Sequence, residues 1–111
     1  MTTVGTIVLQ VKDAYRAARF WALALDYVPR ADDPLILVPK NGAGPALALD
    51  ETDRMHLDLI TSSAQEQKTE VERLISAGAE RVEWTYPDDA TFVVLADTEG
   101  NLFCVLNTGD V

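Results

Sequence analysis

The order of segment types repeats once along the chain, and this repeat constrains the fold more than any other feature. In each half, an apolar segment of strand-like composition precedes an amphipathic helical pattern, and three short apolar segments follow. Residues 6–9 correspond to residues 56–59, and residues 44–48 correspond to residues 100–104. Identity between the halves is low, so the repeat is one of element order and hydrophobic pattern. The sequence therefore predicts two modules of order β-α-β-β-β, module one at about 1–53 and module two at about 54–111.

Module one is expected to contain one helix and four strands. Asp13 is a candidate N-cap for a helix over residues 14–25. Trp21 is expected in the core, because an aromatic residue at this spacing usually packs against a sheet. The buried face of the helix is predicted to consist of Ala17, Phe20, Trp21 and Ala24. The strands are expected at residues 6–10, 27–29, 35–38 and 45–49.

Module two repeats this plan. Ser63 and Glu66 fit a capping box, in which each side chain accepts a hydrogen bond from a backbone N–H at the start of the helix. Gly78 is well placed to end that helix. Its buried stripe is predicted to consist of Val71, Leu74 and Ile75. The strands are expected at residues 56–61, 79–84, 91–96 and 102–106.

Composition and charge narrow the classes of partner. The formal net charge of −9 argues against nucleic acid and anionic membranes, both of which demand a basic face, and favours a cationic ligand. No apolar run approaches the ~20 residues that span a bilayer. The N-terminus lacks a signal-peptide pattern, and a single cysteine excludes an internal disulfide. We therefore expect one cytoplasmic domain over residues 1–111.

The stretch from Met55 to Ile60 holds the only histidine and alternates with period two. Such alternation predicts a half-buried strand, with Met55 and Leu57 on one side and His56 and Asp58 on the other. Two interpretations of the second side stay open. It is either an ordinary solvated strand face or the lining of a pocket.

Several motifs carry a resemblance to a known superfamily, and they span nearly the whole chain. They are Val11-Lys12-Asp13, the Phe20-Trp21 pair, the strand 55–59 with its His-Leu-Asp-Leu core, Gly78-Ala79-Glu80, and the C-terminal segment 95–105. A paired β-α-β-β-β chain with these motifs resembles the vicinal oxygen chelate superfamily. That superfamily includes glyoxalase I, extradiol dioxygenases, fosfomycin-resistance enzymes and bleomycin-binding resistance proteins. The motifs look most like its small glyoxalase-like branch in actinobacterial genomes.

The resemblance implies an α+β fold, in which the two modules form the paired half-barrels of the glyoxalase/bleomycin resistance protein fold. It also implies a homodimer and a cleft between half-barrels. Metal enzymes of the superfamily hold a divalent ion there with side chains from the first and last strand of each module. When each of these ligand positions is transferred to this sequence, the resemblance places them at Thr6, Ala48, His56 and Cys104.

This set departs from the His, Gln and Glu that such enzymes mostly use. Ala48 has no donor atom, and Thr6 is a poor ligand. His56 and Cys104 supply two bonds, with Asp58 expected as a remote third ligand. We therefore expect a site without metal or other cofactor, at which zinc or another divalent ion would bind only weakly.

Two functions from different classes follow. The first is a metal-free binding protein that holds a small organic molecule, such as a cationic antibiotic or other natural product, in a mostly apolar cleft. That cleft is expected to be lined by Thr6, Val8, Ala48, His56, Asp58 and Cys104. The alternative is a glyoxalase-like lyase, isomerase or dioxygenase with His56 as metal ligand or general base. Cys104 is read more readily as a lining residue than as a nucleophile. Trp84 and Tyr86 either cover the cleft or end an exposed strand.

Overall fold

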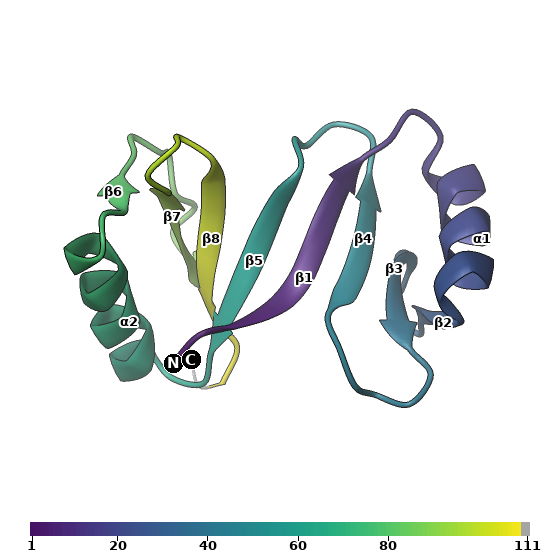
Figure 1. Ribbon diagram of the computed structural model, residues 1–111, viewed down its shortest axis with the longest axis horizontal. Coiled ribbons are helices and arrows are strands. Elements are labelled where there is room, and N and C mark those ends of the chain that lie inside the picture. The colour runs from purple at the N-terminus through teal and green to yellow at the C-terminus, as the bar shows by residue number, and fades with distance from the viewer. Residues whose placement is uncertain (110–111) are drawn as a thin grey trace. The chain divides into compact units, whose positions relative to one another are not determined.

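The computed structural model describes residues 1–109, and within them it contains two helices and eight strands (Figure 1). The elements follow the order β-α-β-β-β twice, which confirms the α+β class and the two predicted modules. They are β1 (Thr3–Gln10), α1 (Ala14–Leu25), β2 (Tyr27–Arg30), β3 (Asp33–Pro39), β4 (Ala46–Asp50), β5 (His56–Thr61), α2 (Ala64–Ser76), β6 (Glu80–Arg81), β7 (Phe92–Ala96) and β8 (Leu102–Asn107). Neither described helix has the length and apolar character needed to cross a membrane.

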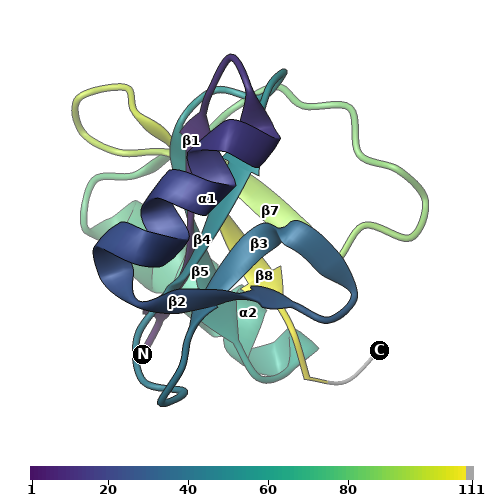
Figure 2. The ribbon, with the colours of Figure 1, turned by 90° about the vertical axis from the view of Figure 1, so that its right-hand side faces the viewer.

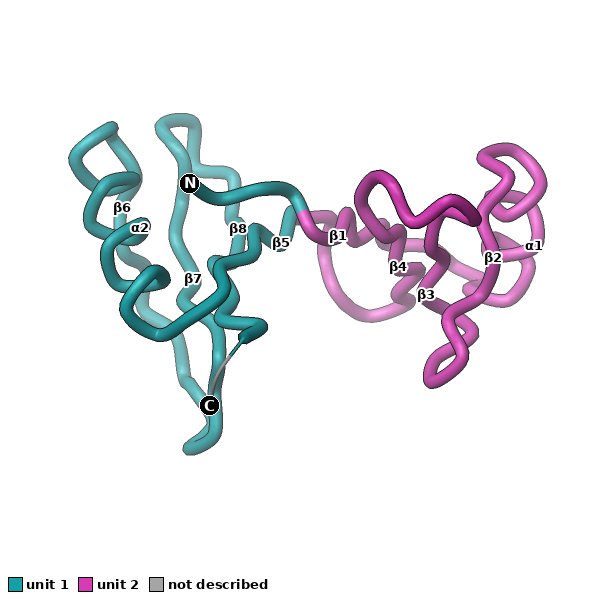
Figure 3. Tube along the Cα trace, turned by 90° about the horizontal axis from the view of Figure 1, so that it is seen from below, with its two compact units in different colours: residues 1–4, 57–111 teal, residues 5–56 magenta. Residues whose placement is uncertain are grey.

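The chain divides into two compact units, which Figure 3 colours separately. The α1 unit is Gly5–His56, and the α2 unit combines Met1–Val4 with the chain from Leu57 onward. The division falls inside β5, so that His56 begins a strand whose other residues belong to the α2 unit.

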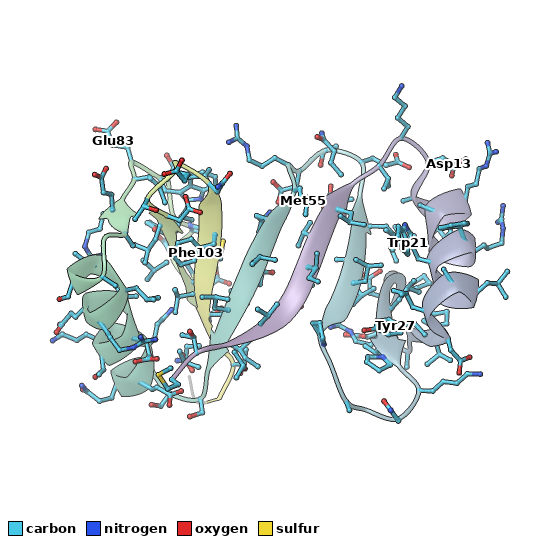
Figure 4. All side chains as sticks on the ribbon, viewed as in Figure 1. Asp13, Trp21, Tyr27, Met55, Glu83 and Phe103 are labelled. Atoms are coloured by element: carbon cyan, nitrogen blue, oxygen red, sulfur yellow. The ribbon has the colours of Figure 1, made fainter. Side chains whose placement is uncertain are left out.

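The α1 unit is a four-stranded sheet with one helix across it. Strand β1 pairs in parallel with β4, β4 pairs antiparallel with β3, and β3 pairs antiparallel with β2. Helix α1 covers one face of these strands (Figure 2). Leu37 is fully buried there, and Trp21 lies between α1 and the sheet (Figure 4). The core of the unit consists of Ala14, Ala18, Leu37, Leu47 and Leu49.

The buried stripe of α1 differs from the predicted one. Ala14 and Ala18 are buried and Trp21 packs against them, whereas Phe20 is 62% exposed. The expectation that Phe20 lies in the core is therefore wrong, and Ala24 is exposed as well. The reason is geometric, because successive residues on a helix turn by about 100°, so that a face centred on Ala18 turns Phe20 away. Phe20 instead meets the Trp21 ring edge-on, with 5.2 Å between ring centroids.

The α2 unit repeats the arrangement. Strand β5 pairs in parallel with β8, which pairs antiparallel with β7, and β7 pairs antiparallel with β6. Helix α2 contributes buried Val71, and Leu74 and Ile75 pack beside it as predicted. Phe103 reaches the same cluster from β8 (Figure 4). The core of the unit consists of Val71, Leu95 and Val105.

Strand β6 is much shorter than predicted. Only Glu80 and Arg81 pair with β7, although the sequence predicts a strand over residues 79–84. Farther along β7, the backbone N–H of Val94 donates instead to the hydroxyl of Tyr86, at 2.8 Å. A side-chain oxygen thus replaces a backbone ladder partner at this edge, which allows the chain to leave the sheet.

Candidate functional site

In the α1 unit, the sheet face opposite the helix carries three of the predicted site residues. Ile7 and Leu9 of β1 contact the core beneath α1, so their neighbours along the strand point to the other face. Val8 lies there directly opposite Ala48 of β4, and Thr6 lies two residues before Val8. Val8 is buried, and Thr6 and Ala48 are half-buried. Among these three, Thr6 alone has a polar side chain, so this face offers little chemistry.

The corresponding face of β5 and β8 carries the other three predicted residues. Phe103 and Val105 pack towards α2, so Cys104 between them points to the opposite face. Asp58 is the register partner of Cys104, and His56 lies two residues before Asp58 on the same face. One potential ligand atom from each of the three lies within 4.8 Å of the others, and all three residues are half-buried. The prediction that Asp58 is remote from His56 and Cys104 is therefore wrong.

Burial along β5 bears on the two interpretations that the alternation left open. The His56 side chain is only 12% exposed. Its apolar neighbours face outward more, since Leu57 is 37% exposed and Met55, which lies just before the strand (Figure 4), is exposed too. A fully solvated row of polar side chains would show the reverse. These exposures argue against a fully solvated strand face at His56, and the pocket-lining interpretation stays a prediction.

His56 is oriented by the loop that precedes it. Its Nδ1 lies 2.8 Å from the backbone carbonyl oxygen of Arg54, and 3.9 Å from a carboxylate oxygen of Asp53. Because a carbonyl oxygen only accepts hydrogen bonds, Nδ1 carries the proton in this contact. In the neutral ring, Nε2 is then the nitrogen with a lone pair for a ligand or a proton.

Asp50 orders this loop. One of its carboxylate oxygens accepts hydrogen bonds from the backbone N–H groups of Thr52 and Asp53, at 2.8 and 2.9 Å. These bonds, first the one from Thr52 and then the one from Asp53, lower the pKa of Asp50 from its ordinary value. Asp50 and Asp53 were not predicted from the sequence as supports of His56. The Asp-x-Thr-Asp spacing, typical of an Asx turn, is the signal that points to them.

Tyr86 is fixed along β7, the strand that pairs with β8 and so with the strand that carries Cys104 of the trio His56, Asp58 and Cys104. The hydroxyl of Tyr86 binds Val94, and Val94 is the register partner of Cys104 across β7 and β8. The Tyr86 ring also contacts Phe92, with 5.4 Å between centroids. Trp84 is about half exposed, and the covering of the cleft by either Trp84 or Tyr86 stays a prediction. Of the two aromatic residues left open by the sequence, Tyr86 is the one held beside β7.

The α1 unit also contains a hollow of about 300 Å³ that no sequence pattern predicted. An ion pair between Lys40 and Asp26, at 3.0 Å, lies in its wall. The hollow is lined by Leu25, Asp26, Tyr27, Pro39, Lys40, Asn41 and Ala43. It includes none of the predicted site residues, and its lining contains no histidine or cysteine.

Comparison with protein families gives one match that covers nearly the whole chain. The family described as glyoxalase-like domain matches residues 6–106, which include all six predicted cleft residues. No curated protein matches the sequence.

Solved structures support the fold. The crystal structure of NAD-dependent benzaldehyde dehydrogenase from Legionella pneumophila has a TM-score of 0.65 and 17% identity, over 92% of this chain and 96% of that one. A hypothetical protein from Bacillus halodurans has a TM-score of 0.57 and 11% identity, over 99% and 96%. A member of the glyoxalase/bleomycin resistance protein/dioxygenase superfamily from Sphaerobacter thermophilus matches 96% of this chain and 98% of that one, at 20% identity and a TM-score of 0.38. At these identities the first two indicate a shared fold only, and the TM-score of the third is too low to support any conclusion.

Proposed function

Because the chain belongs to the glyoxalase-like domain family of the vicinal oxygen chelate superfamily, we propose that it binds a small organic molecule on the face of β5 and β8 that points away from α2. The observation that carries this proposal is the convergence of His56, Asp58 and Cys104, half-buried and within 4.8 Å of one another. Ligand sites of small molecules combine a mostly apolar lining with a few polar groups that fix orientation. The trio supplies such polar groups.

Apolar side chains surround the trio on the same face. Leu106 follows Cys104 at the two-residue spacing of a strand, and Ile60 follows Asp58 in the same way. Phe92 is the register partner of Leu106 and supports the ring of Tyr86. An apolar or aromatic ligand body would contact these residues while its polar group meets the trio. Thr6, Val8 and Ala48 remain ligand-contact residues predicted from the sequence.

Charge favours a cationic ligand. Residues 57–111 contain 11 Asp and Glu against 3 Lys and Arg, a formal net charge of −8. Residues 1–56 contain 7 against 6, a net charge of −1. The negative field of the protein therefore arises almost entirely in the part of the chain that carries Asp58 and Cys104, and it would attract a basic molecule to that part. An antibiotic or other natural product with a positive charge fits this field, and its binding would provide a resistance role.

Titration calorimetry with a cationic glycopeptide tests the proposal. Metal-free bleomycin is the probe, in buffers of low and high salt, and His56→Ala is compared with Asp89→Asn, an exposed acidic residue of the loop before β7. We expect binding by the wild type and by Asp89→Asn, weaker binding in high salt, and loss of binding in His56→Ala with an unchanged circular dichroism spectrum. If His56→Ala bound bleomycin with the same affinity as the wild type, the trio would not be part of the binding site. If bleomycin does not bind, the same comparison with a panel of cationic and neutral aromatic compounds decides whether a cationic ligand is preferred.

The same trio also favours a second function, that of a glyoxalase-like lyase or isomerase. With its proton on Nδ1, His56 presents Nε2 as a general base, and Asp58 would stabilise the protonated ring. The hemithioacetal of methylglyoxal and glutathione is the probe, with thioester formation as the readout. The net charge of −8 over residues 57–111 disfavours this anionic adduct, which is why binding is proposed first. Turnover lost in His56→Ala, together with no binding of cationic compounds, would reverse that order.

We also propose that the protein is a cytoplasmic homodimer. Large apolar side chains are exposed on the single chain, among them Leu23 and Met55, and a symmetric partner is the ordinary way to cover such residues. The single cysteine fits a reducing compartment. Light scattering at micromolar protein should give about twice the chain mass of 12.2 kDa. A mass near 12.2 kDa at all concentrations would contradict the dimer.

A further inference from the structure

We propose that His56, Asp58 and Cys104 bind one divalent transition-metal ion of the zinc type. The inference rests on the proposed function only for the location of the site, on the face of β5 and β8 that points away from α2, which we call the working face. It does not depend on which organic molecule binds there. It departs from the four ligand positions that the superfamily resemblance implies, because Ala48 lacks a donor atom and Thr6 is a poor ligand. The new set takes its third ligand, Asp58, from the middle of β5 instead.

The backbone arrangement explains how three ligands meet. Asp58 and Cys104 are register partners on adjacent parallel strands, so their side chains leave the same face about 4.8 Å apart. His56 starts two residues, about 6.6 Å, before Asp58 along the strand, and its long side chain can span that interval. The register of β5 and β8 therefore aligns one nitrogen, one oxygen and one sulfur ligand over the same patch of sheet.

The measured spacing is compatible with coordination after small side-chain rotations. A tetrahedral zinc ion with bonds of about 2.0–2.3 Å places its ligand atoms about 3.3–3.8 Å apart. The three candidate atoms lie within 4.8 Å of one another, so no pair has to close by more than about 1.5 Å on binding. Rotation about side-chain bonds provides this movement without a change in the strands.

A second observation, independent of the spacing, points to the same ligand. The Nδ1–H of His56 donates to the backbone carbonyl of Arg54 at 2.8 Å. Histidines that bind metals almost always donate their other ring N–H to a carbonyl or carboxylate, which fixes the tautomer and the ring orientation. The Asp53 carboxylate, 3.9 Å from the same Nδ1, adds negative charge behind the ring. His56 thus has the outer support that a metal-binding histidine requires.

The donor set selects the class of ion. Imidazole and thiolate suit zinc, cobalt and nickel, whereas magnesium and calcium prefer oxygen ligands. When the Cys104 thiol binds, its proton passes to solvent, and the resulting thiolate and the Asp58 carboxylate balance the two positive charges of the ion. Three protein ligands leave a fourth position for water or for an organic ligand.

Cobalt titration of the metal-free protein tests the proposal directly. The chain contains one cysteine and one histidine, so thiolate-to-cobalt charge-transfer absorption reports on Cys104 and no other residue. We expect one Co²⁺ bound per chain with this absorption, displacement of Co²⁺ by Zn²⁺, and no displacement by a large excess of Mg²⁺. Cys104→Ser should abolish the absorption, and His56→Ala and Asp58→Asn should each weaken Zn²⁺ binding at least about tenfold.

Asp89→Asn is the matched control, because it removes the same charge from an exposed loop of the same part of the chain. It should bind Zn²⁺ as the wild type does. Asp58→Asn keeps the shape of the side chain, so it provides a readout even if His56→Ala fails to fold. Absence of the absorption in the wild type, or equal Zn²⁺ affinity in wild type and Asp58→Asn, would overturn the metal site.

The failures of this inference and of the proposed function can be told apart. Binding of metal-free bleomycin without any cobalt signal would overturn the metal site and leave the binding function in place. A cobalt signal without binding of any organic probe would do the opposite. Melting temperatures with and without chelator add a second readout, since an ion that binds only the folded state raises the melting temperature.

Discussion

The two units share an element order but differ on the sheet face that their helices leave uncovered. In the α1 unit that face carries Thr6, Val8 and Ala48, and its register pair is Val8 with Ala48. In β5 and β8 the corresponding pair is Asp58 with Cys104. The covered faces, in contrast, are apolar in both units. The hydrophobic repeat therefore determines the fold through the helix-covered face of each sheet. The uncovered face is not constrained in this way, and it carries reactive side chains in one unit alone.

The first test of the comparison destabilises the core of each unit in turn and compares the losses in the free energy of unfolding. Leu37 of the α1 unit and Leu95 of the α2 unit are both 0% exposed, so Leu37→Ala and Leu95→Ala form a matched pair. Each should lower the free energy of unfolding by about 2–5 kcal/mol. Because one domain is predicted, each should shift a single transition in denaturant, followed by the fluorescence of Trp21 and Trp84. A variant that shifts only one of two separate transitions would show that the units unfold independently.

The second test checks which face of helix α1 is buried. Trp21 packs against the α1 core, and Trp21→Ala should lower the free energy of unfolding by about 3 kcal/mol, the lower end of the range for large aromatic residues because Trp21 is only half-buried. Phe20→Ala is the control on the adjacent residue. It removes an exposed ring and should cost less than about 1 kcal/mol. Equal losses in chemical denaturation would mean that the helix face is assigned wrongly.

The sequence predicts the covered faces better than the working face, for a physical reason. The helix over residues 14–25 and the strand over 56–61 follow from local periodicity and match the structure. The position of Phe20 does not follow, because the small side chains of Ala14 and Ala18 compete for the same face and only packing decides between them. The short β6 depends on the bond between Tyr86 and Val94, which joins residues in different segments.

The trio shows the same limit at the candidate site. His56 and Cys104 were identified from the superfamily resemblance, but the proximity of Asp58 depends on which residue of β8 it opposes. Pairing register between parallel strands that are far apart in sequence is a property of the folded sheet, and a shift by one residue would turn Asp58 away from Cys104. Local pattern therefore placed the residues on a strand face without showing that they meet.

The third test concerns Glu70 of α2, a buried acidic residue. Helix α1 has no equivalent, since its buried residues are both alanines. Glu70 of α2 is buried, and its carboxylate accepts hydrogen bonds from Arg73 at 2.9 and 3.1 Å and pairs with the Met1 amine at 3.2 Å. Arg73 first, and then the amine, lower the pKa of Glu70 from 4.5 to about 2.

The sign of the resulting pH dependence follows from this lowered pKa. A carboxylate with a lower pKa in the folded state stabilises the fold above the unfolded value of 4.5, and this contribution is lost as the pH falls towards 2. Glu70→Gln should therefore be less stable than wild type at pH 7, and the difference should shrink between pH 4.5 and 2. Glu72→Gln, an exposed neighbour on α2, should behave as wild type. A Glu70→Gln difference that stays constant over this range in urea melts would contradict the lowered pKa.

The smallest expected effects are at the helix N-termini, where the two units again differ. The Ser63 hydroxyl accepts from the Glu66 N–H at 3.0 Å, and the Glu66 carboxylate accepts from Ser62, one residue earlier than a standard capping box predicts. At α1, Asp13 accepts from the Arg16 N–H at 3.1 Å, and Glu51, which directly follows β4, accepts from the Ala14 N–H at 2.9 Å. The start of α2 is thus capped by local residues, and the start of α1 by a local and a distant carboxylate.

This difference predicts unequal costs for equivalent substitutions. Ser63→Ala should lower the free energy of unfolding by about 1 kcal/mol. Asp13→Ala should cost less, because Glu51 still binds one N–H and keeps a negative charge at the positive end of the helix. Adding Glu51→Ala to Asp13→Ala should then cost about 1 kcal/mol more, because no carboxylate is left on the first turn. Denaturant melts in which the Asp13→Ala loss exceeds that of Ser63→Ala, with no further loss from Glu51→Ala, would show that the distant carboxylate contributes nothing to the cap.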